Sequence, residues 1–538
     1  MAPGAHLHRK PSTPQAIRMA RPKVTNRMVD KDVYKDLRTG SRISLPRVEQ
    51  HGIDYIPESE RRSRPSNLYV LLLGGSMTFG LFIIGWYPIA FGLGWWSAAT
   101  SIAAGSAVGA VFLGLSGLMG PHSGTNNPVS SGAYFGVAGR LIGSVLEGTA
   151  SLAFAAISIW TGGDALASAL IRFFDMPDNE AVRLVAYAVL SIIVTVISVY
   201  GHHSMMASLK FILPTAGLCM VVGVFVYAKD FDASYAGTGT YAFGSELSTW
   251  LVSALLSAAT VSSYAAYSGD WTRHIAPQKF SDRRIVLTLF LGGIFGMGVC
   301  FLWGAFTSAA AFNAGAADAD TPFVFGIVDI VPLWYIPALL YLGLASGTTQ
   351  AVINTYGTGL DTSAIIPRFN RVQATLLACG LATVLVYVGH FYDRIESGMS
   401  IYLQLLVCFS IPWVVIVVYG HVKRRGYYDV DDLQVFNRRQ RGGIYWYHGG
   451  LNPRTLGLWV VSAVVGMMFS VNDAYTGPLA PLVGGIDGGL VASGVVALAG
   501  CPVIHRFWPD KPEVYGPERL PEHNPSAQEA PAAALEPS

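Results

Sequence analysis

Long apolar stretches recur along most of this chain, and no other feature restricts its possible folds as strongly. Most are close to the ~20 residues that a helix needs to cross ~30 Å of hydrocarbon. In a bilayer every backbone N–H and C=O must find a partner within the protein, which favours helices. The sequence therefore predicts an all-α integral membrane protein with twelve transmembrane helices. The predicted spans are residues 67–92, 95–119, 140–171, 182–201, 207–228, 247–269, 285–312, 333–360, 372–390, 399–420, 456–472 and 482–503.

The composition agrees with a membrane protein. Charged residues make up 13% of the chain, against ~25% in typical soluble proteins. The chain has 59 glycines, which allow helices to approach closely in lipid. Its five cysteines are scattered without a CxxC pair, so we expect neither a metal centre nor a disulfide framework. The net charge of +2 gives no reason to expect a nucleic-acid partner.

The positive charges suggest an orientation. With twelve spans, most loop Lys and Arg, such as Lys279 and Arg368, fall on the side of the N-terminus. Cytoplasmic loops carry this excess, so we expect both termini in the cytoplasm and the protein in the plasma (inner) membrane. The remaining segments are predicted to be a disordered basic tail (1–66), a cytoplasmic loop (421–455) and a disordered C-terminal tail (504–538).

Two spans contain sequence that weakens a helix. Gly, Ser and Thr gather at Gly74–Gly80 in the first span and at Ser262–Asp270 in the sixth. A pair of interrupted spans at matching positions of two halves indicates a transporter binding site. The alternative is that these small residues only mediate helix packing.

Several short motifs resemble one family of carriers. They are Pro88–Trp96, Gly120–Thr125, Ser131–Gly136, Tyr267–Arg273 and Asn354–Gly357. In order and spacing they are similar to motifs of the purine-cytosine permease family, also called nucleobase:cation symporter family 1.

The resemblance implies a LeuT-like fold with a 5+5 inverted repeat. Residues 67–228 would form the first repeat, residues 247–420 the second, and residues 456–503 two additional C-terminal helices. The ligand would lie at mid-membrane between spans 1, 3, 6 and 8. The substrate-binding residues carried over, with their neighbours, are Trp160, Asp164, Ser263, Tyr264, Asn354 and Thr78.

The resemblance also implies a coupling ion, Na⁺ or H⁺, and no other cofactor. In Na⁺-coupled relatives the matching positions would be Ala345, Thr348 and Thr349, with Gly75 from the first span. Hydroxyl and carbonyl oxygens suit such a hard cation.

The residues themselves agree with a heterocycle site. Trp160 and Asp164 are four apart, so they share a helix face. Asp164 stands where the family has an amide, and an ionised carboxylate only accepts hydrogen bonds. It would therefore prefer a ligand edge rich in N–H groups, or a cation. The alternatives are that Trp160 is a packing or interface residue, Tyr264 a core residue, and Asp164 a group facing external water.

Three further charged residues lie within or at the ends of spans. Asp270 and Arg273 are predicted to form a structural or gating ion pair. Glu147 is predicted to pair with Arg140 or to relay a proton. Charged groups inside membranes are costly and usually functional.

The leading hypothesis is a monomeric symporter, in contact with membrane lipid, that imports a nucleobase. Allantoin, a hydantoin, thiamine or pyridoxine are alternative substrates. No convergent catalytic groups point to an enzyme, and no repeated filter sequence points to a channel; these remain remote alternatives.

Overall fold

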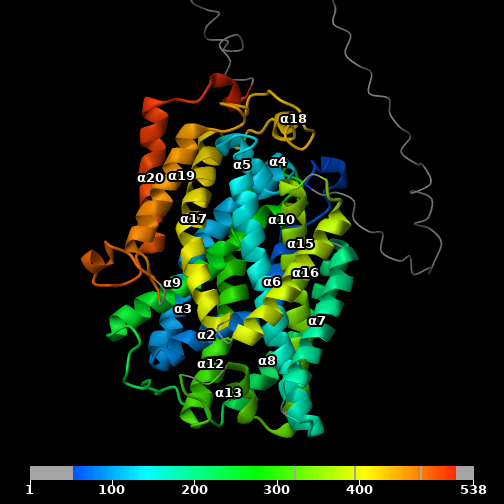
Figure 1. Cartoon of the computed structure of the whole chain (residues 1–538), viewed down its shortest axis with the longest axis vertical. Helices are drawn as coiled ribbons and strands as arrows, with labels where there is room; N and C mark the ends of the chain where they lie inside the picture. Colours follow the sequence, from blue (N-terminus) through cyan, green and yellow to red (C-terminus); the bar gives the residue numbers. More distant parts are fainter. Residues whose placement is uncertain are drawn as a thin grey trace, which may run out of the picture. The chain divides into compact units, whose positions relative to one another are not determined.

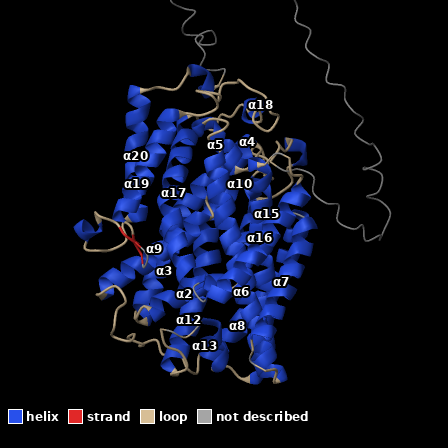
Figure 2. Cartoon of the chain, in the orientation of Figure 1, coloured by secondary structure: helices blue, strands red, loops and turns tan. Residues whose placement is uncertain are grey.

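The computed structural model describes residues 53–516, except 178, 201, 320, 322, 367, 393, 394, 473 and 474. The predicted basic tail lies outside the described residues up to residue 52. Within the described part, helices dominate, and Figure 2 shows one short strand pair. This pair joins β1 (Val471–Asn472) to β2 (Tyr475–Thr476) in antiparallel register.

The helices of the first half begin after a single turn, η2 (Glu58–Glu60). They are α1 (Pro65–Ser76), α2 (Phe79–Ala90), α3 (Trp95–Ser116), α4 (Met119–Ser123), α5 (Asn127–Phe135), α6 (Leu141–Phe174), α7 (Glu180–Tyr200) and α8 (His202–Tyr227).

The second half begins with a broken span and ends with an apolar helix pair. Its helices are α9 (Glu246–Ser263), α10 (Ser268–Thr272), α11 (Asp282–Leu291), the π-helical η3 (Gly292–Gly298), α12 (Val299–Asn313), α13 (Phe323–Asp329), η4 (Leu333–Tyr335), α14 (Ile336–Tyr341), the π-helical η5 (Leu342–Ser346), α15 (Gly347–Ile365), α16 (Arg371–Tyr392), α17 (Ile395–Lys423), α18 (Val430–Leu433), α19 (Pro453–Phe469), η6 (Ala480–Val483), α20 (Gly489–Phe507) and η7 (Pro512–Tyr515).

The multi-pass helical class is confirmed, but the number of spans is not. Among the described residues, nine helical segments are long and apolar enough to cross a membrane, or ten if α1 and α2 count as one bent span. Of the other predicted spans, α19 is apolar but shorter. The Ser/Thr-rich α9 is not among the nine. Helices nevertheless occupy all twelve predicted positions.

Both predicted helix interruptions are present. α1 ends at Ser76, Thr78 is extended, and α2 leaves at an angle of 66°. α9 ends at Ser263, and α10 begins only at Ser268. The two broken spans also contact each other crosswise, α1 with α10 and α2 with α9. The interruptions are therefore neighbours in space.

Glycines allow the main helix pairs to pack at close range, as membrane helices require. A side chain at Gly85 of α2 would collide with the Phe301 carbonyl oxygen of α12. Gly304 of α12 meets the Phe82 carbonyl of α2 in the same way. Gly105 brings α3 equally close to α9. The high glycine content thus has a packing role.

The last two apolar helices form a unit against α17. α19 and α20 pack on each other, and both contact α17. In Figure 1 the pair stands at one side of the bundle. Residues 504–516 belong to the tail predicted to be disordered, but α20 continues to Phe507 and η7 follows it. The rest of that tail, from residue 517, lies outside the described residues.

Candidate functional site

Four elements converge where the helices are interrupted. α6 and α15 pack along each other, and the first broken span contacts both of them. The sixth span reaches them through Tyr264, which contacts Phe154 of α6 and Gln350 of α15. At Gly162 of α6, a Cβ would lie 2.8 Å from the Gly343 carbonyl oxygen of η5. The convergence of the first, third, sixth and eighth predicted spans is the arrangement that the family resemblance implies.

The first interruption touches both α6 and α15. A Cβ at Gly80 would lie 3.5 Å from the hydroxyl oxygens of Ser158 and Thr161 on α6. A Cβ at Gly75 would lie 2.6 Å from Cδ1 of Ile353 on α15. The absence of side chains at Gly75 and Gly80 therefore allows the first span to lie close to both α6 and α15.

The two aromatic rings predicted to enclose the substrate have other partners in this conformation. Tyr264, at the end of α9, lies 5.7 Å from the Phe154 ring and accepts a hydrogen bond from Gln350 Nε2. Trp160 is half-buried on α6, and its side chain interacts with Tyr187 of α7. The facing pair of Trp160 and Tyr264 stays a prediction.

Asp164 is buried, although the sequence left open that it faces external water. Its side chain lies one turn beyond Trp160 on α6, and the residue is 7% exposed. Its Oδ1 accepts a hydrogen bond of 2.6 Å from the Tyr187 hydroxyl. Tyr187 therefore orients this carboxyl group.

Two of the predicted substrate residues are buried polar groups without a partner among the described residues. Asn354 of α15 is 1% exposed, and neither its amide nitrogen nor its amide oxygen has a hydrogen bond. The Thr78 hydroxyl, at the start of α2, has none either. Ser263 is satisfied locally, since its hydroxyl donates to the Thr260 carbonyl. Buried polar groups are normally paired, so Asn354 and Thr78 are suited to a polar ligand.

The predicted cation ligands lie on the helix carrying Asn354. The Thr349 hydroxyl donates to the Ala345 carbonyl oxygen at 2.7 Å. Thr348, Thr349 and Ala345 line a cavity of about 310 Å³ that α7 and α8 also border. The residue closest to Gly75 is Ile353, followed by Gln350. A cation cage that joins Gly75 to the threonines stays a prediction.

The predicted gating residues belong to a buried cluster of charges. Glu147 of α6 approaches the carboxyl group of Asp270 on α10 and is under the electrostatic influence of Arg273. The predicted pairing of Glu147 with Arg140 is not found in the described structure. Arg140 instead acts on Asp361.

Two residues of this region were not among the predicted site residues. Gln350 contacts Tyr264, and Asp361 joins the charge cluster. Gln350, Asn354 and Asp361 follow the i, i+4, i+11 spacing of one helix face. That periodicity was the available signal, and it marks a polar stripe along α15.

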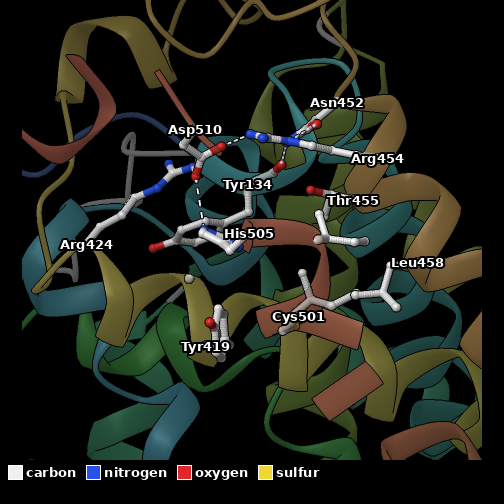
Figure 3. Close-up of a pocket in the computed structure, with 13 residues that line it drawn as sticks. Tyr134, Tyr419, Arg424, Asn452, Arg454, Thr455, Leu458, Cys501, His505 and Asp510 are labelled. Carbon is white, nitrogen blue, oxygen red and sulfur yellow. Dashed lines mark hydrogen bonds and ion pairs between the residues drawn. The ribbon is translucent and has the colours of Figure 1, made fainter. Parts of the chain in front are cut away.

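A different charge cluster holds the C-terminal segment, and we call it the C-terminal clamp. It consists of Asp510 with Arg424, Arg454 and His505, as Figure 3 shows. Arg424 lies 2.9 Å and the His505 ring nitrogen 3.4 Å from Asp510 Oδ2, while Arg454 pairs with Oδ1. Arg424 also stacks on Tyr134, whose pKa burial raises to about 12, so this ring stays neutral.

With this geometry in place, comparison with known proteins assigns the chain to a family. Residues 55–496 match the model of the family described as "Permease for cytosine/purines, uracil, thiamine, allantoin". The chain belongs to this family. It is therefore a transporter of the nucleobase:cation symporter type and not an enzyme.

Relatives support the assignment at the level of sequence and fold. The permease is 25% identical over 457 residues to the Bacillus subtilis (strain 168) protein named "Putative purine-cytosine permease YxlA", covering 82% of this chain and 92% of that protein. A closed, bromovinylhydantoin-bound structure of the nucleobase-cation-symport-1 transporter Mhp1 matches with a TM-score of 0.66 at 18% identity, over 86% of this chain and 97% of Mhp1. A Na⁺-coupled sialic acid symporter matches with a TM-score of 0.53 at 12% identity, over 84% and 92% of the two chains. These likenesses show the fold that the permease shares with them.

Proposed function

We propose that the permease imports a nucleobase together with a cation across the plasma membrane. It would do so as a monomer with twelve spans in a 5+5 inverted repeat plus two helices, and with both termini in the cytoplasm. The observation that carries the proposal is the buried amide of Asn354 on α15, which has no partner among the described residues. Both broken spans reach this helix, through Gly75 and Tyr264. An amide offers donors and an acceptor, which matches the mixed edge of a nucleobase.

The carboxyl group of Asp164 supports a particular substrate class. While ionised it accepts hydrogen bonds only, and Tyr187 orients it. Amino-bearing bases such as cytosine, adenine and guanine present N–H groups to such an acceptor. Uracil presents fewer. Allantoin, hydantoins, thiamine and pyridoxine are the alternative substrates.

The aromatic residues would provide stacking. Trp160 is half-buried on the same face as Asp164, and Tyr264 ends the sixth span's first half. Stacking on an aromatic side chain contributes ~1–3 kcal/mol per base in other proteins. In the occupied state we expect Trp160 to cover one face of the ring and Tyr264 the other.

For the coupling ion, we propose Na⁺ at Ala345, Thr348 and Thr349 with backbone from Gly75. The supporting observation is that Ala345, Thr348 and Thr349 line one cavity. Oxygen ligands of this kind suit hard cations. The competing candidate for the coupling ion is H⁺.

The test is uptake of cytosine, adenine, uracil, allantoin and thiamine into proteoliposomes, with Na⁺ or with choline in its place. We expect saturable uptake of an amino-bearing base, and no dependence on Na⁺ would reject the Na⁺ site. Asn354→Ala should weaken binding about tenfold or more, since a buried hydrogen bond to a ligand is worth ~1–3 kcal/mol. Asn313→Ala, which alters an exposed amide bonded to the Asp230 carbonyl, is the matched control. Unchanged binding in the Asn354 variant would contradict the proposed site.

A further inference from the structure

Three carboxyl groups meet on the inner faces of three helices, apart from the groups assigned to the substrate. They belong to Glu147 of α6, Asp270 of α10 and Asp361 of α15, and each residue is at most 1% exposed. A Cβ built at Gly357 would lie 3.3 Å from Asp270 Oδ2 and 4.0 Å from Glu147 Oε1. The missing side chain at Gly357 thus leaves room for the two acids to approach.

Glu147 has no hydrogen-bond donor among the described residues. Neither of its carboxyl oxygens accepts an N–H or O–H, although both are buried. Its Oε1 and Asp270 Oδ2 both lie within 4.0 Å of the position that a Cβ at Gly357 would take, so the two carboxyl groups are neighbours. Two carboxyl groups can hydrogen-bond only if one of them carries a proton. If both were ionised, their repulsion in this dry interior would be severe.

The hydroxyl group of Ser151 lies near the same Gly357 position as the two carboxyl groups. Ser151 of α6 is 1% exposed, and its Oγ has no partner among the described residues. This oxygen would lie 3.4 Å from a Cβ at Gly357, the position that both acids also face. A hydroxyl can donate or accept, so Ser151 can bond to Glu147 in either protonation state.

Each cation around the cluster also has an acceptor outside the three carboxyl groups. Arg273 donates to the Tyr356 hydroxyl at 3.2 Å, and Arg140 donates to Asn437 of the α18 region. Arg371 of α16 lies over the Tyr356 ring and donates to backbone carbonyls of α7. The titratable or charged groups near Glu147 or its two acidic neighbours are Asp270, Arg273, Tyr267, Asp361, Tyr356, Arg140 and Arg371.

The cluster is connected to the substrate region by polar side chains. On α6, Glu147, Ser151 and Ser158 share one face, and Ser158 lies beside Gly80 of the first broken span. On α15, Asp361 lies two turns, or ~10 Å, beyond the unpartnered Asn354. A change at the substrate groups can therefore act on the cluster through α6, α15 or the short α10.

We propose that Glu147 is a proton-binding site used in transport. In this conformation it carries a proton shared with Asp270. When α10 moves relative to α6 and the cluster opens, the proton leaves the Glu147 oxygen for water, and a new proton is taken up on the opposite side. No other bond forms or breaks. The inference rests on the proposed function for its substrate, and it is separate from the Na⁺ site on α15.

The first test is independent of any substrate. Infrared spectra of the purified full chain should show the C=O stretch of a protonated carboxyl group at neutral pH. The band should be lost in Glu147→Gln and retained in Glu180→Gln, which makes the same change at an exposed position on α7. Should Glu147→Gln not fold, Asp270→Asn should shift the same band. Absence of the band in the unmodified protein, or its persistence in Glu147→Gln, would overturn the proposal.

The second test measures proton movement. Proteoliposomes with a pH-sensitive dye inside should acidify when cytosine or adenine is added outside in medium that contains Na⁺. In Glu147→Gln we expect accumulation driven by a pH gradient to fall about tenfold or more, with substrate exchange retained. Unchanged proton movement in this variant would overturn the inference alone. If the unmodified protein moves no nucleobase, the proposed function fails, while the infrared result still decides whether Glu147 holds a proton.

Discussion

The C-terminal clamp and the Glu147 cluster, which consists of Glu147, Asp270 and Asp361, bury carboxyl groups in opposite electrostatic surroundings. In the clamp, one carboxylate with a side chain 2% exposed is surrounded by Arg424, Arg454 and His505. In the cluster, neither oxygen of Glu147 has a donor among the described residues, and another acid lies beside it. Both regions bury carboxyl groups, but only in the clamp do guanidinium groups pair directly with the carboxyl group compared here, as Arg424 and Arg454 do with Asp510.

The difference separates a structural site from one that can exchange protons. A buried carboxylate paired with guanidinium groups stays ionised, because removing its charge would leave the cations uncompensated. A buried carboxyl group that has another acid as its neighbour lowers its energy by binding a proton. We therefore expect the clamp to govern stability and the cluster to govern coupling.

The largest effect should come from Asp510→Asn. This change leaves Arg424 buried without its carboxylate, and breaking a buried pair costs about 3–5 kcal/mol. Thermal unfolding in detergent should show a strongly lowered midpoint. In the protein that remains folded, substrate affinity should be unchanged, because the clamp does not touch the substrate residues.

The control for this prediction is Asp431→Asn. Asp431 pairs with Arg438 at 3.0 Å, but its side chain is 83% exposed. Surface pairs contribute about 0–1 kcal/mol, so the midpoint should hardly move. Equal losses in the two variants would show that burial of the clamp is not what makes it important.

A smaller effect is expected for Arg140→Gln. This change removes the cation acting on Asp361 and the stacking of Arg140 on Phe436. A proton on Asp361 can take over part of the neutralisation, so we expect a loss of about 1–3 kcal/mol. A loss as large as that of Asp510→Asn would mean that the cluster depends on permanent cations as strongly as the clamp does, contrary to the difference inferred between the two regions.

The smallest change in stability is expected for Glu147→Gln. An amide has nearly the shape of a protonated carboxyl group and can still donate to Asp270, so unfolding should shift by less than about 1 kcal/mol. Thermal unfolding measures this alongside the Glu180→Gln control. Strong destabilisation would show that Glu147 is ionised and paired, contrary to the proton-binding proposal.

Sequence reasoning located the helices and their interruptions well. Hydrophobic length is a local property, so all twelve apolar stretches contain helices in the structure. The Gly-rich first span and the Ser/Tyr-rich sixth span break where small and polar residues weaken the helix. The Ser/Thr content that marks the sixth span also explains why α9 is not among the segments with enough apolar character to span a membrane.

Partner choice was harder to predict. Arg140 and Glu147 lie two turns apart on one chain segment, so a local pair was a reasonable hypothesis. Arg140 instead acts on Asp361, which is far away in sequence. The predicted aromatic pair also has other partners. Tyr264 packs on Phe154 and Gln350, and the side chain of Trp160 interacts with Tyr187.

The amino-acid sequence was sufficient to predict the membrane class, the positions of the helices, the two interruptions and, through its motifs, the family. These depend on residues close together along the chain, where apolar length and helix propensity act. Three features came from packing alone: Asp361 joins Glu147 and Asp270, Asn354 has no partner among the described residues, and Asp510 is held by two guanidinium groups and the His505 ring. The energy of a buried charge depends on the groups that surround it in space, and packing brings those groups together from distant helices.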